Sequence, residues 1–132
     1  MFGPPGTLYV YRSYGIHWCV NVTCEPVGTA AAVLLRALEP TAGLDEMRAR
    51  RGSVPDRALC AGPGRLTEAL GITNADDGAA ITEPPFELLA PVEAVEVVAT
   101  PRVGITRAAD LPWRYVVKGS GWLSRGPRSA PL

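Results

Sequence analysis

The residues with the clearest chemical potential lie near the start of the chain, in the stretch TLYVYRSYGIHWCVNVT from Thr7 to Thr23. It contains the only histidine, His17, and one of the three cysteines, Cys19, and a second cysteine, Cys24, follows it directly. A serine or cysteine triad around His17 would need a nucleophile motif such as GxSxG, which the sequence lacks. Two cysteines with one nearby histidine make a weak metal-ligand pattern. Neither triad chemistry nor a metal site is therefore favoured.

Two other sets of residues could do chemistry but fit structural roles better. Gly62-Pro63-Gly64 has neither the spacing nor the lysine of a phosphate-binding loop. The adjacent carboxylates Asp45-Glu46 and Asp76-Asp77 are typical of a first helical turn and of a turn, respectively. The residue types alone thus identify no paired acid and base.

Two strands joined by a tight reversal account for the Thr7 to Thr23 stretch. β-branched and aromatic residues run from Leu8 to Tyr11 and resume from Ile16 to Val22, on either side of Ser13-Tyr14-Gly15. Glycine tolerates the positive φ that hairpin turns need, but an aromatic side chain at a loop tip points into water and gains little from folding. Tyr14 is therefore predicted to have a role outside the fold.

Length and composition predict one domain in a reducing, cytoplasmic compartment. The chain has 132 residues, of which 47% are hydrophobic, enough to bury about two-thirds of the surface that the unfolded chain exposes. The three cysteines are odd in number and come without a signal peptide, so a disulfide framework is not favoured. No apolar run approaches the roughly 20 residues of a membrane span.

The charges are balanced overall but uneven along the chain. The 13 basic and 13 acidic residues cancel, which argues mildly against a nucleic-acid partner, because phosphate neutralisation dominates duplex binding. Asp76 to Glu96 contains six acids and no base, whereas from Arg102 onward six bases accompany the single acid Asp110. Two interpretations stay open: an ordinary solvated surface, or a basic edge that follows a phosphate backbone.

The middle of the chain predicts a strand and two short helices. Ala30 to Pro40 (AAAVLLRALEP) is a nearly continuous apolar run, which predicts a central strand covered on both faces, with a short buried helix as the alternative. Arg36 interrupts it and must either point out at the strand's end or have a specific partner, because an unpaired buried charge is costly.

Gly43 to Arg51 carries acids early and bases late, as a helix dipole favours. Arg65 to Gly71 has leucines four residues apart and a terminal glycine, which predicts the second helix.

Strands predominate in the rest of the chain. Phe86 to Leu89 is a candidate strand, and Val95 to Ala99 and Trp113 to Lys118 are predicted strands. Ser124 to Leu132 is rich in Pro, Ser and Gly and is predicted to be disordered. Because no strand-helix-strand rhythm appears, the predicted fold class is α+β: a single domain with a mainly antiparallel β-sheet, short helices and a protruding β-hairpin.

Five segments together resemble the alkyladenine (3-methyladenine) DNA glycosylase family. They are YVYRSYGIHWCVNVT, LLRALEP, CAGPGRLTEALGI, PRVGI and PWRYVVKGSGW, in the family's order, and the resemblance covers Met1 to about Arg125. It implies a monofunctional enzyme that hydrolyses the N-glycosidic bond of alkylated or deaminated purines. Residues 1–125 would be the C-terminal portion of that domain, followed by a disordered tail at 126–132. The implied protein is a monomer without metal or organic cofactor, whose partner is double-stranded DNA containing damaged purines and not a membrane.

The resemblance gives the hairpin a role in DNA. The hairpin would enter the minor groove, and Tyr14 would fill the space left when the damaged nucleotide rotates out into a pocket. Ile16 and His17 would flank this intercalating side chain and contact the DNA. For His17, a solvated strand histidine is an equally good interpretation.

The resemblance also assigns the base pocket and the water. Tyr11 would form a wall that stacks on the flipped base, and Asn21 would donate a hydrogen bond to the base edge and disfavour an exocyclic amino group. Arg36 would help to hold the attacking water and a phosphate, and the backbone carbonyl of Val103 would accept a hydrogen bond from the same water. Without the resemblance, Tyr11 is a core aromatic, Asn21 an ordinary residue at the end of a strand and Arg36 a structural cation.

In the family the general base is a glutamate in a Glu-x-Tyr segment upstream of the position that matches Met1. General-base assistance is typically worth about 100- to 10,000-fold in rate, so we expect the 132-residue chain to release no base by itself. Two interpretations follow. The first is an enzyme whose N-terminal portion lies outside this sequence, supported by the match of Met1 to an internal methionine of the family. The second is a shortened, non-catalytic relative that binds damaged DNA.

Overall fold

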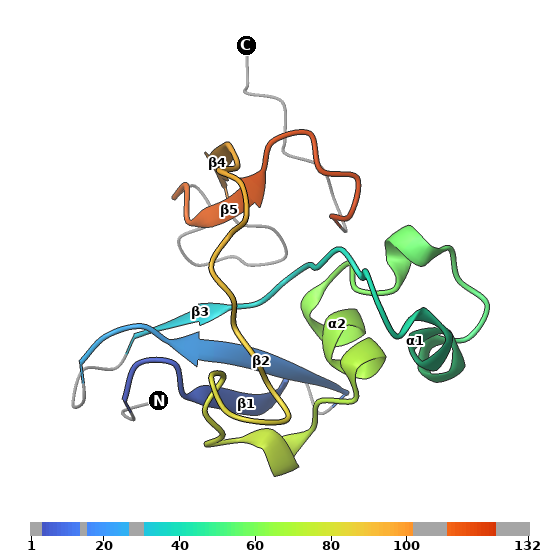
Figure 1. The fold of residues 1–132 in the computed structure, drawn as a ribbon, viewed down its shortest axis with the longest axis horizontal. Helices are drawn as coiled ribbons and strands as arrows, with labels where there is room; N and C mark the ends of the chain where they lie inside the picture. Colours follow the sequence, from blue (N-terminus) through green and yellow to red (C-terminus); the bar gives the residue numbers. More distant parts are fainter. Residues whose placement is uncertain (1–3, 14–15, 27–30, 102–110, 124–132) are drawn as a thin grey trace. The chain divides into compact units, whose positions relative to one another are not determined.

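The computed structural model describes residues 4–13, 16–26, 31–101 and 111–123. The chain divides into two compact units, residues 1–89 with 122–124 (unit 1) and residues 90–121 with 125–132 (unit 2). The elements in chain order are β1 (Leu8–Ser13), β2 (His17–Thr23), β3 (Ala32–Leu34), α1 (Leu44–Arg51), the 3₁₀ helix η1 (Asp56–Ala58), α2 (Pro63–Leu70), the 3₁₀ helix η2 (Asn74–Asp76), β4 (Val97–Thr100) and β5 (Arg114–Val117) (Figure 1). Short helices with antiparallel sheets confirm the α+β class.

The predicted hairpin is confirmed as β1 and β2. The two strands are antiparallel, with Leu8 opposite Val22 at one end and Ser13 opposite His17 at the other. β3 pairs antiparallel with β2, so the sheet order is β1-β2-β3 and the second strand of the hairpin is the central one. The outer edge of β1 is also paired, because Leu8 N–H donates to the carbonyl of Ala79 over 2.7 Å.

The carboxylate pairs Asp45-Glu46 and Asp76-Asp77 both have structural roles, as predicted. Asp45 lies in the first turn of α1. Asp76 closes a capping box with Thr73 at the start of η2. Asp77 accepts a hydrogen bond from the backbone N–H of Val10 over 2.9 Å and so satisfies the edge of β1. These acids stabilise turns and strand edges.

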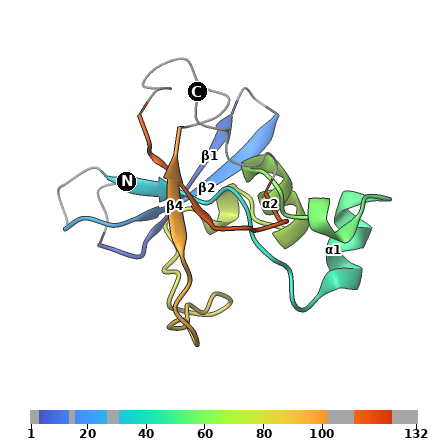
Figure 2. The same cartoon turned by 90° about the horizontal axis from the view of Figure 1, so that it is seen from above.

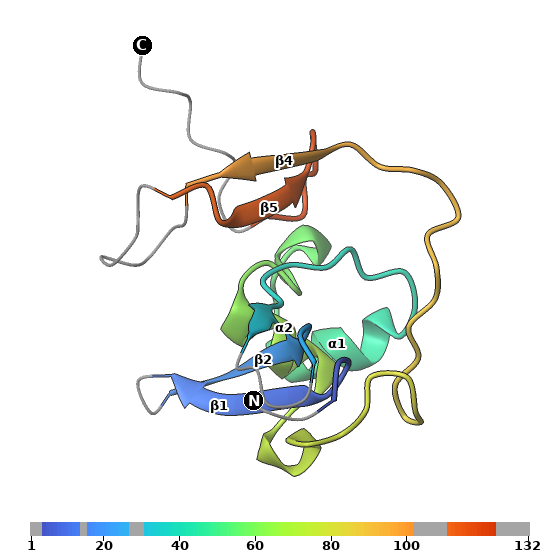
Figure 3. The same ribbon diagram turned by 90° about the vertical axis from the view of Figure 1, so that its left-hand side faces the viewer.

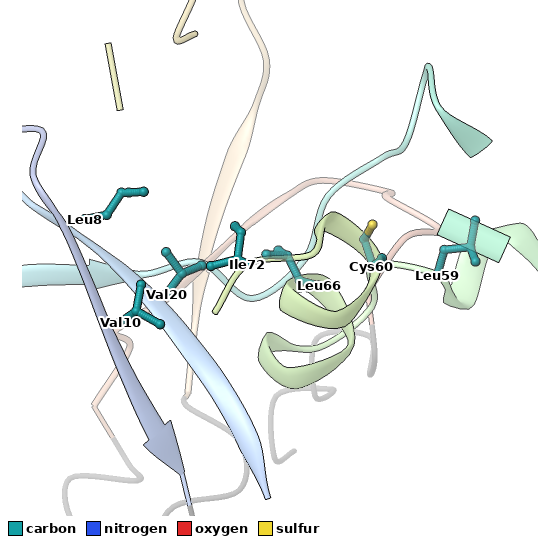
Figure 4. Packing of buried hydrophobic residues seen from close by; sticks show 8 residues of the cluster. Leu8, Val10, Val20, Leu59, Cys60, Leu66 and Ile72 are labelled. Atoms are coloured by element: carbon teal, nitrogen blue, oxygen red, sulfur yellow. The ribbon is translucent and has the colours of Figure 1, made fainter. Parts of the chain in front are cut away.

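The core of unit 1 lies between one face of the hairpin and α2. Its fully or nearly buried members are Leu8, Val10, Val20, Leu59, Cys60, Leu66, Ala69 and Ile72, most of which Figure 4 shows in a row that runs from the sheet to α2. Leu66 is 0% exposed, and fully burying a side chain of this kind stabilises a fold by about 1.5–3 kcal/mol. The inward face of the hairpin is thus fixed by its alternate aliphatic residues.

Both predicted helices are confirmed. α1 carries Asp45 and Glu46 in its first turn and its arginines in its last turn, which complements the helix dipole. α2 begins at Pro63, two residues before the predicted start, and ends at Gly71, whose φ of 70° is left-handed and favours glycine. Figure 2 shows the two helices side by side. None of the described helices is long and apolar enough to span a membrane.

Of the two further strand predictions in unit 1, the one for Ala30 to Pro40 is confirmed only in part and the one for Phe86 to Leu89 is wrong. Among the described residues 31–40, Ala32–Leu34 alone form a strand, and that strand lies at the sheet edge instead of the centre, where Val33 is 53% exposed. The remaining residues leave the sheet after Leu35: Ala37 makes a single bridge with Ala61. After Leu35 the chain therefore pairs with the segment that precedes α2, at Ala61 and Gly62. Residues 86–89 form no strand.

Unit 2 contains a two-stranded antiparallel ribbon. β4 and β5 run in opposite directions, with Val97 opposite Val117 and Thr100 opposite Arg114 (Figure 3). Both correspond to predicted strands: β4 begins two residues and ends one residue later than the predicted Val95 to Ala99, and β5 is one residue shorter at each end than the predicted Trp113 to Lys118. The predicted tail, Ser124 to Leu132, and the segment Arg102 to Ile105 lie outside the described residues.

Candidate functional site

The hairpin has two chemically different faces. Opposite residues in an antiparallel pair project to the same face, and successive residues alternate between faces. The pairs Leu8–Val22 and Val10–Val20 make the core face, so the intervening pairs Tyr9–Asn21 and Tyr11–Cys19 make the other face. We call these four residues, Tyr9, Tyr11, Cys19 and Asn21, the polar face. The register therefore brings the predicted pocket residues Tyr11 and Asn21 onto one face of one ribbon.

Tyr11 presents a partly exposed aromatic ring. It is 39% exposed, which leaves ring surface for a ligand, and its ring centroid lies 5.5 Å from that of Tyr9 with an interplanar angle of 33°. Burial, followed by interactions with Cys19 and Tyr9, raises the pKa of the Tyr11 phenol, and the charge of Arg36 acts in the opposite direction. The phenol is therefore neutral at physiological pH.

Asn21 is buried, with 8% of its surface exposed, and is not an ordinary end-of-strand residue. Its Nδ2 donates to the backbone carbonyl of Tyr9 over 3.3 Å. An asparagine amide has two N–H donors and a carbonyl acceptor, so this bond leaves one donor and the acceptor for another partner. A buried amide with remaining donor capacity, next to an aromatic ring, can read the edge of a planar heterocycle.

Arg36 lies two residues after the end of β3, half-buried rather than within a central strand. Its backbone carbonyl accepts a hydrogen bond from the N–H of Gly62 over 2.7 Å, which holds it beside the start of α2. Its positive charge is close enough to Tyr11 to oppose, in part, the rise in the pKa of that phenol. The structure thus places the predicted cation within electrostatic reach of the polar face.

The far end of the hairpin is exposed. Ile16 is 69% exposed, and His17, which closes the strand pairing opposite Ser13, is also exposed. The His17 ring lies over α2, where a Cβ built on Gly64 would come within 2.7 Å of its Cγ. The tip residue Tyr14 and the predicted water ligand Val103 lie outside the described residues. The described part of the tip offers an apolar and an aromatic nitrogen-bearing side chain to a partner.

Sequence reasoning did not assign Tyr9 and Cys19 to the site. Both lie two residues from a predicted pocket residue, Tyr9 from Tyr11 and Cys19 from Asn21, and the two-residue period of a strand could have found them. Within the described ranges, no group of three His, Cys, Asp or Glu side chains is arranged to hold a metal ion. The polar face therefore offers stacking and hydrogen bonding.

Known proteins resemble this chain closely. Residues 1–121 match the family described as "Methylpurine-DNA glycosylase (MPG)". A "Putative 3-methyladenine DNA glycosylase" of Rhodopseudomonas palustris (strain BisB18) is 59% identical over 125 residues, which are 95% of this chain and 62% of the relative. Relatives with the same name from Rhodopseudomonas palustris (strain ATCC BAA-98 / CGA009) and Nitrosospira multiformis are 61% and 57% identical, with 61% and 65% of their lengths covered.

The chain thus spans about three-fifths of the length of the curated relatives that it matches. The family match, in contrast, covers almost the whole of the chain. It includes both strands of the hairpin, the helix that packs on them and the β4–β5 ribbon. The chain belongs to the methylpurine-DNA glycosylase family.

Proposed function

We propose that the chain acts in base-excision repair, as part of a monofunctional N-glycosylase that hydrolyses the glycosidic bond of alkylated or deaminated purines after base flipping. The observation that carries the proposal is the polar face of the hairpin, which holds both the half-exposed ring of Tyr11 and the buried amide of Asn21. A flipped purine needs an aromatic surface for its ring and a hydrogen-bonding group for its edge. These two residues supply both.

Binding would begin with the hairpin tip. Tyr14 would fill the gap in the duplex, while the exposed side chains of Ile16 and His17 contact the neighbouring sugar and phosphate groups. Wedge insertion offsets the few kcal/mol of stacking that a flipped base loses. The basic residues around the chain's C-terminal third would follow the phosphate backbone.

Recognition would depend on Asn21. With one N–H already donated to Tyr9, the second N–H can bond an acceptor at the purine edge. An exocyclic amino group at that position would present a donor to a donor and leave both unpaired, which costs about 1–3 kcal/mol. Normal adenine would therefore be disfavoured relative to hypoxanthine.

In the hydrolysis step, a water attacks C1′ of the sugar, the bond from C1′ to the purine nitrogen breaks and a C1′–O bond forms. Arg36 and the carbonyl of Val103 would position this water. The proton of the water passes to the general base, a role that the family resemblance gives to a glutamate preceding the position of Met1. The purine leaves with the bonding electron pair.

A second candidate function is recognition of damaged DNA without cleavage. The observation that favours it is the composition of the polar face, whose four residues include no carboxylate. Such a protein would keep the intercalating Tyr14, the stacking surface of Tyr11 and the hydrogen-bonding amide of Asn21, but it would leave the glycosidic bond intact.

Both candidate functions are tested in one experiment. The 132-residue chain is incubated with duplexes that hold one hypoxanthine or one ethenoadenine. We expect tighter binding to these duplexes than to an undamaged duplex, weaker binding for Tyr14→Ala, and no base release by this chain alone. The matched control is Tyr115→Ala, which removes an exposed tyrosine of β5. Equal affinity for damaged and undamaged duplexes would refute the proposal, and base release at the rate of a longer relative would refute the role given to the upstream glutamate.

A further inference from the structure

Tyr9 touches both of the residues proposed to hold the flipped base. Its ring centroid lies 5.5 Å from that of Tyr11, and its backbone carbonyl accepts the hydrogen bond from Asn21 Nδ2 over 3.3 Å. The strand register also places Tyr9 directly opposite Asn21. Among the described residues, Tyr9 alone makes both a ring contact with Tyr11 and a backbone hydrogen bond with the side chain of Asn21.

The ring of Tyr9 is not explained by core packing. Tyr9 is only partly buried, and it belongs neither to the hydrophobic core of unit 1 nor to the residues packed against that core. Its ring lies on the polar face, where it makes an aromatic contact with Tyr11. A large aromatic side chain on this face therefore acts on its neighbour.

The geometry shows how it acts. Side chains two apart on a strand are about 6.6–7 Å apart at the backbone, whereas these ring centroids are 5.5 Å apart, so the rings lean toward each other within the range that aromatic pairs favour. The half-exposed ring of Tyr11 would otherwise sample several rotamers. Contact with Tyr9 restricts it before a ligand arrives and lowers the entropy lost on binding.

We propose that Tyr9 is a positioning residue for the base pocket: its ring fixes the orientation of the Tyr11 ring on which the flipped purine stacks, while its carbonyl orients the amide of Asn21. This inference rests on the proposed function. Because the carbonyl belongs to the backbone, a change of the Tyr9 side chain removes the ring contact and leaves the bond to Asn21 in place.

The test uses Tyr9→Phe and Tyr9→Val with a duplex that contains one ethenoadenine, a fluorescent purine whose emission reports stacking. Phenylalanine keeps the ring, so Tyr9→Phe should retain wild-type affinity and emission. Valine suits a strand but has no ring, so Tyr9→Val should bind about 2- to 12-fold more weakly and should show the altered emission of Tyr11→Val. The control Tyr115→Val, at an exposed position of β5, should change neither quantity.

A double mutant identifies positioning as the cause. If Tyr9 acts through Tyr11, the double variant Tyr9→Val/Tyr11→Val should bind no more weakly than Tyr11→Val alone. Additive losses, or wild-type emission in Tyr9→Val, would overturn the inference. If Tyr9→Val does not fold, nuclear Overhauser contacts between the two rings in the unaltered chain decide, and their absence would overturn it equally. If Tyr11→Val itself has no effect, the proposed function fails instead.

Discussion

Thr67 joins α2 to the edge of the hairpin, and its replacement by valine tests how much that link stabilises unit 1. Thr67 is 2% exposed, and its Oγ1 lies 2.8 Å from the carbonyl oxygen of Trp18 and 2.9 Å from that of Gly64. Trp18 and Val20 are two residues apart in β2, so their carbonyls face the same edge, where that of Val20 accepts from the N–H of Leu35. The Thr67 hydroxyl therefore supplies the next donor along this edge, beyond the end of the strand pairing.

The expected cost follows from the geometry. Thr67→Val keeps the shape of the side chain and removes the O–H, so no cavity forms but the carbonyl of Trp18 loses its donor under α2. Leaving a buried acceptor unsatisfied costs about 1–3 kcal/mol, and we expect a free energy of unfolding lower by about 1–2 kcal/mol. For a unit of this size, 1 kcal/mol corresponds to roughly 4–8 °C in Tm, so Tm should fall by about 5–15 °C.

Urea unfolding followed by circular dichroism measures this change, and an unaltered m value would show that the unfolded surface is the same. The matched control is Thr41→Val at an exposed position, which should stay within about 0.5 kcal/mol of the parent chain. Equal stabilities of Thr67→Val and Thr41→Val would refute the reasoning.

Three further changes test the packing of the hairpin, its charge and the acid stability of unit 1. Gly64→Ala should destabilise the chain although alanine favours helix by about 1 kcal/mol, because its Cβ would lie 2.7 Å from Cγ of His17; a higher Tm in thermal unfolding would contradict this. Arg12→Ala, at an exposed position near the hairpin end, should reduce the slope of log K against log salt for duplex binding by about 0.9, whereas Arg12→Lys should preserve the slope, and equal slopes for both variants would exclude a phosphate contact. The Arg48 guanidinium holds the pKa of Asp56 below its usual value, so this pair stabilises the fold above the unfolded pKa of about 4 and the contribution is lost as pH falls through the folded pKa. Asp56→Asn should therefore flatten the acid side of the stability curve, and an unchanged curve would show that the pair contributes nothing.

The sequence predicts an element correctly where its conformation depends on residues that are close together along the chain. The hairpin follows from alternation on both sides of Ser13-Tyr14-Gly15, and α1 follows from the order of its charges. The end of α2 follows from Gly71, whose left-handed φ of 70° only glycine adopts readily. In each case a local rule and the tertiary contacts favour the same conformation.

The Ala30 to Pro40 segment shows what local pattern leaves open. An apolar run indicates burial but does not name the partner. Here β2 pairs with only three residues of the run, Ala32–Leu34, and Ala37 then pairs with Ala61. The segment contacts two partners in turn, and only the tertiary structure determines where the change occurs. Arg36 lies at this change, which explains how a cation fits an apolar run.

The candidate site was predictable in part for the same reason. Alternation within each strand groups Tyr9 with Tyr11 and Cys19 with Asn21, but which pairs lie opposite depends on the register across the turn. The observed register, with Ser13 opposite His17, places both pairs on one face. A shift of one residue would send Asn21 to the core face, so the site depends on this register.

The burial of Asn21 shows how one ribbon can support both folding and recognition. A buried amide destabilises a fold unless it is hydrogen-bonded, and Asn21 obtains its bond from the carbonyl of Tyr9 in the adjacent strand. This hydrogen bond needs no contribution from the core face, where Val10 and Val20 belong to the hydrophobic core that includes Leu66 of α2. Because the packing of the core face and the hydrogen bond of the polar face are independent, the aliphatic residues can fix the position of the hairpin while the Asn21 amide keeps one N–H donor for a ligand. That donor is oriented before binding, so a purine acceptor would gain a hydrogen bond with little loss of conformational entropy.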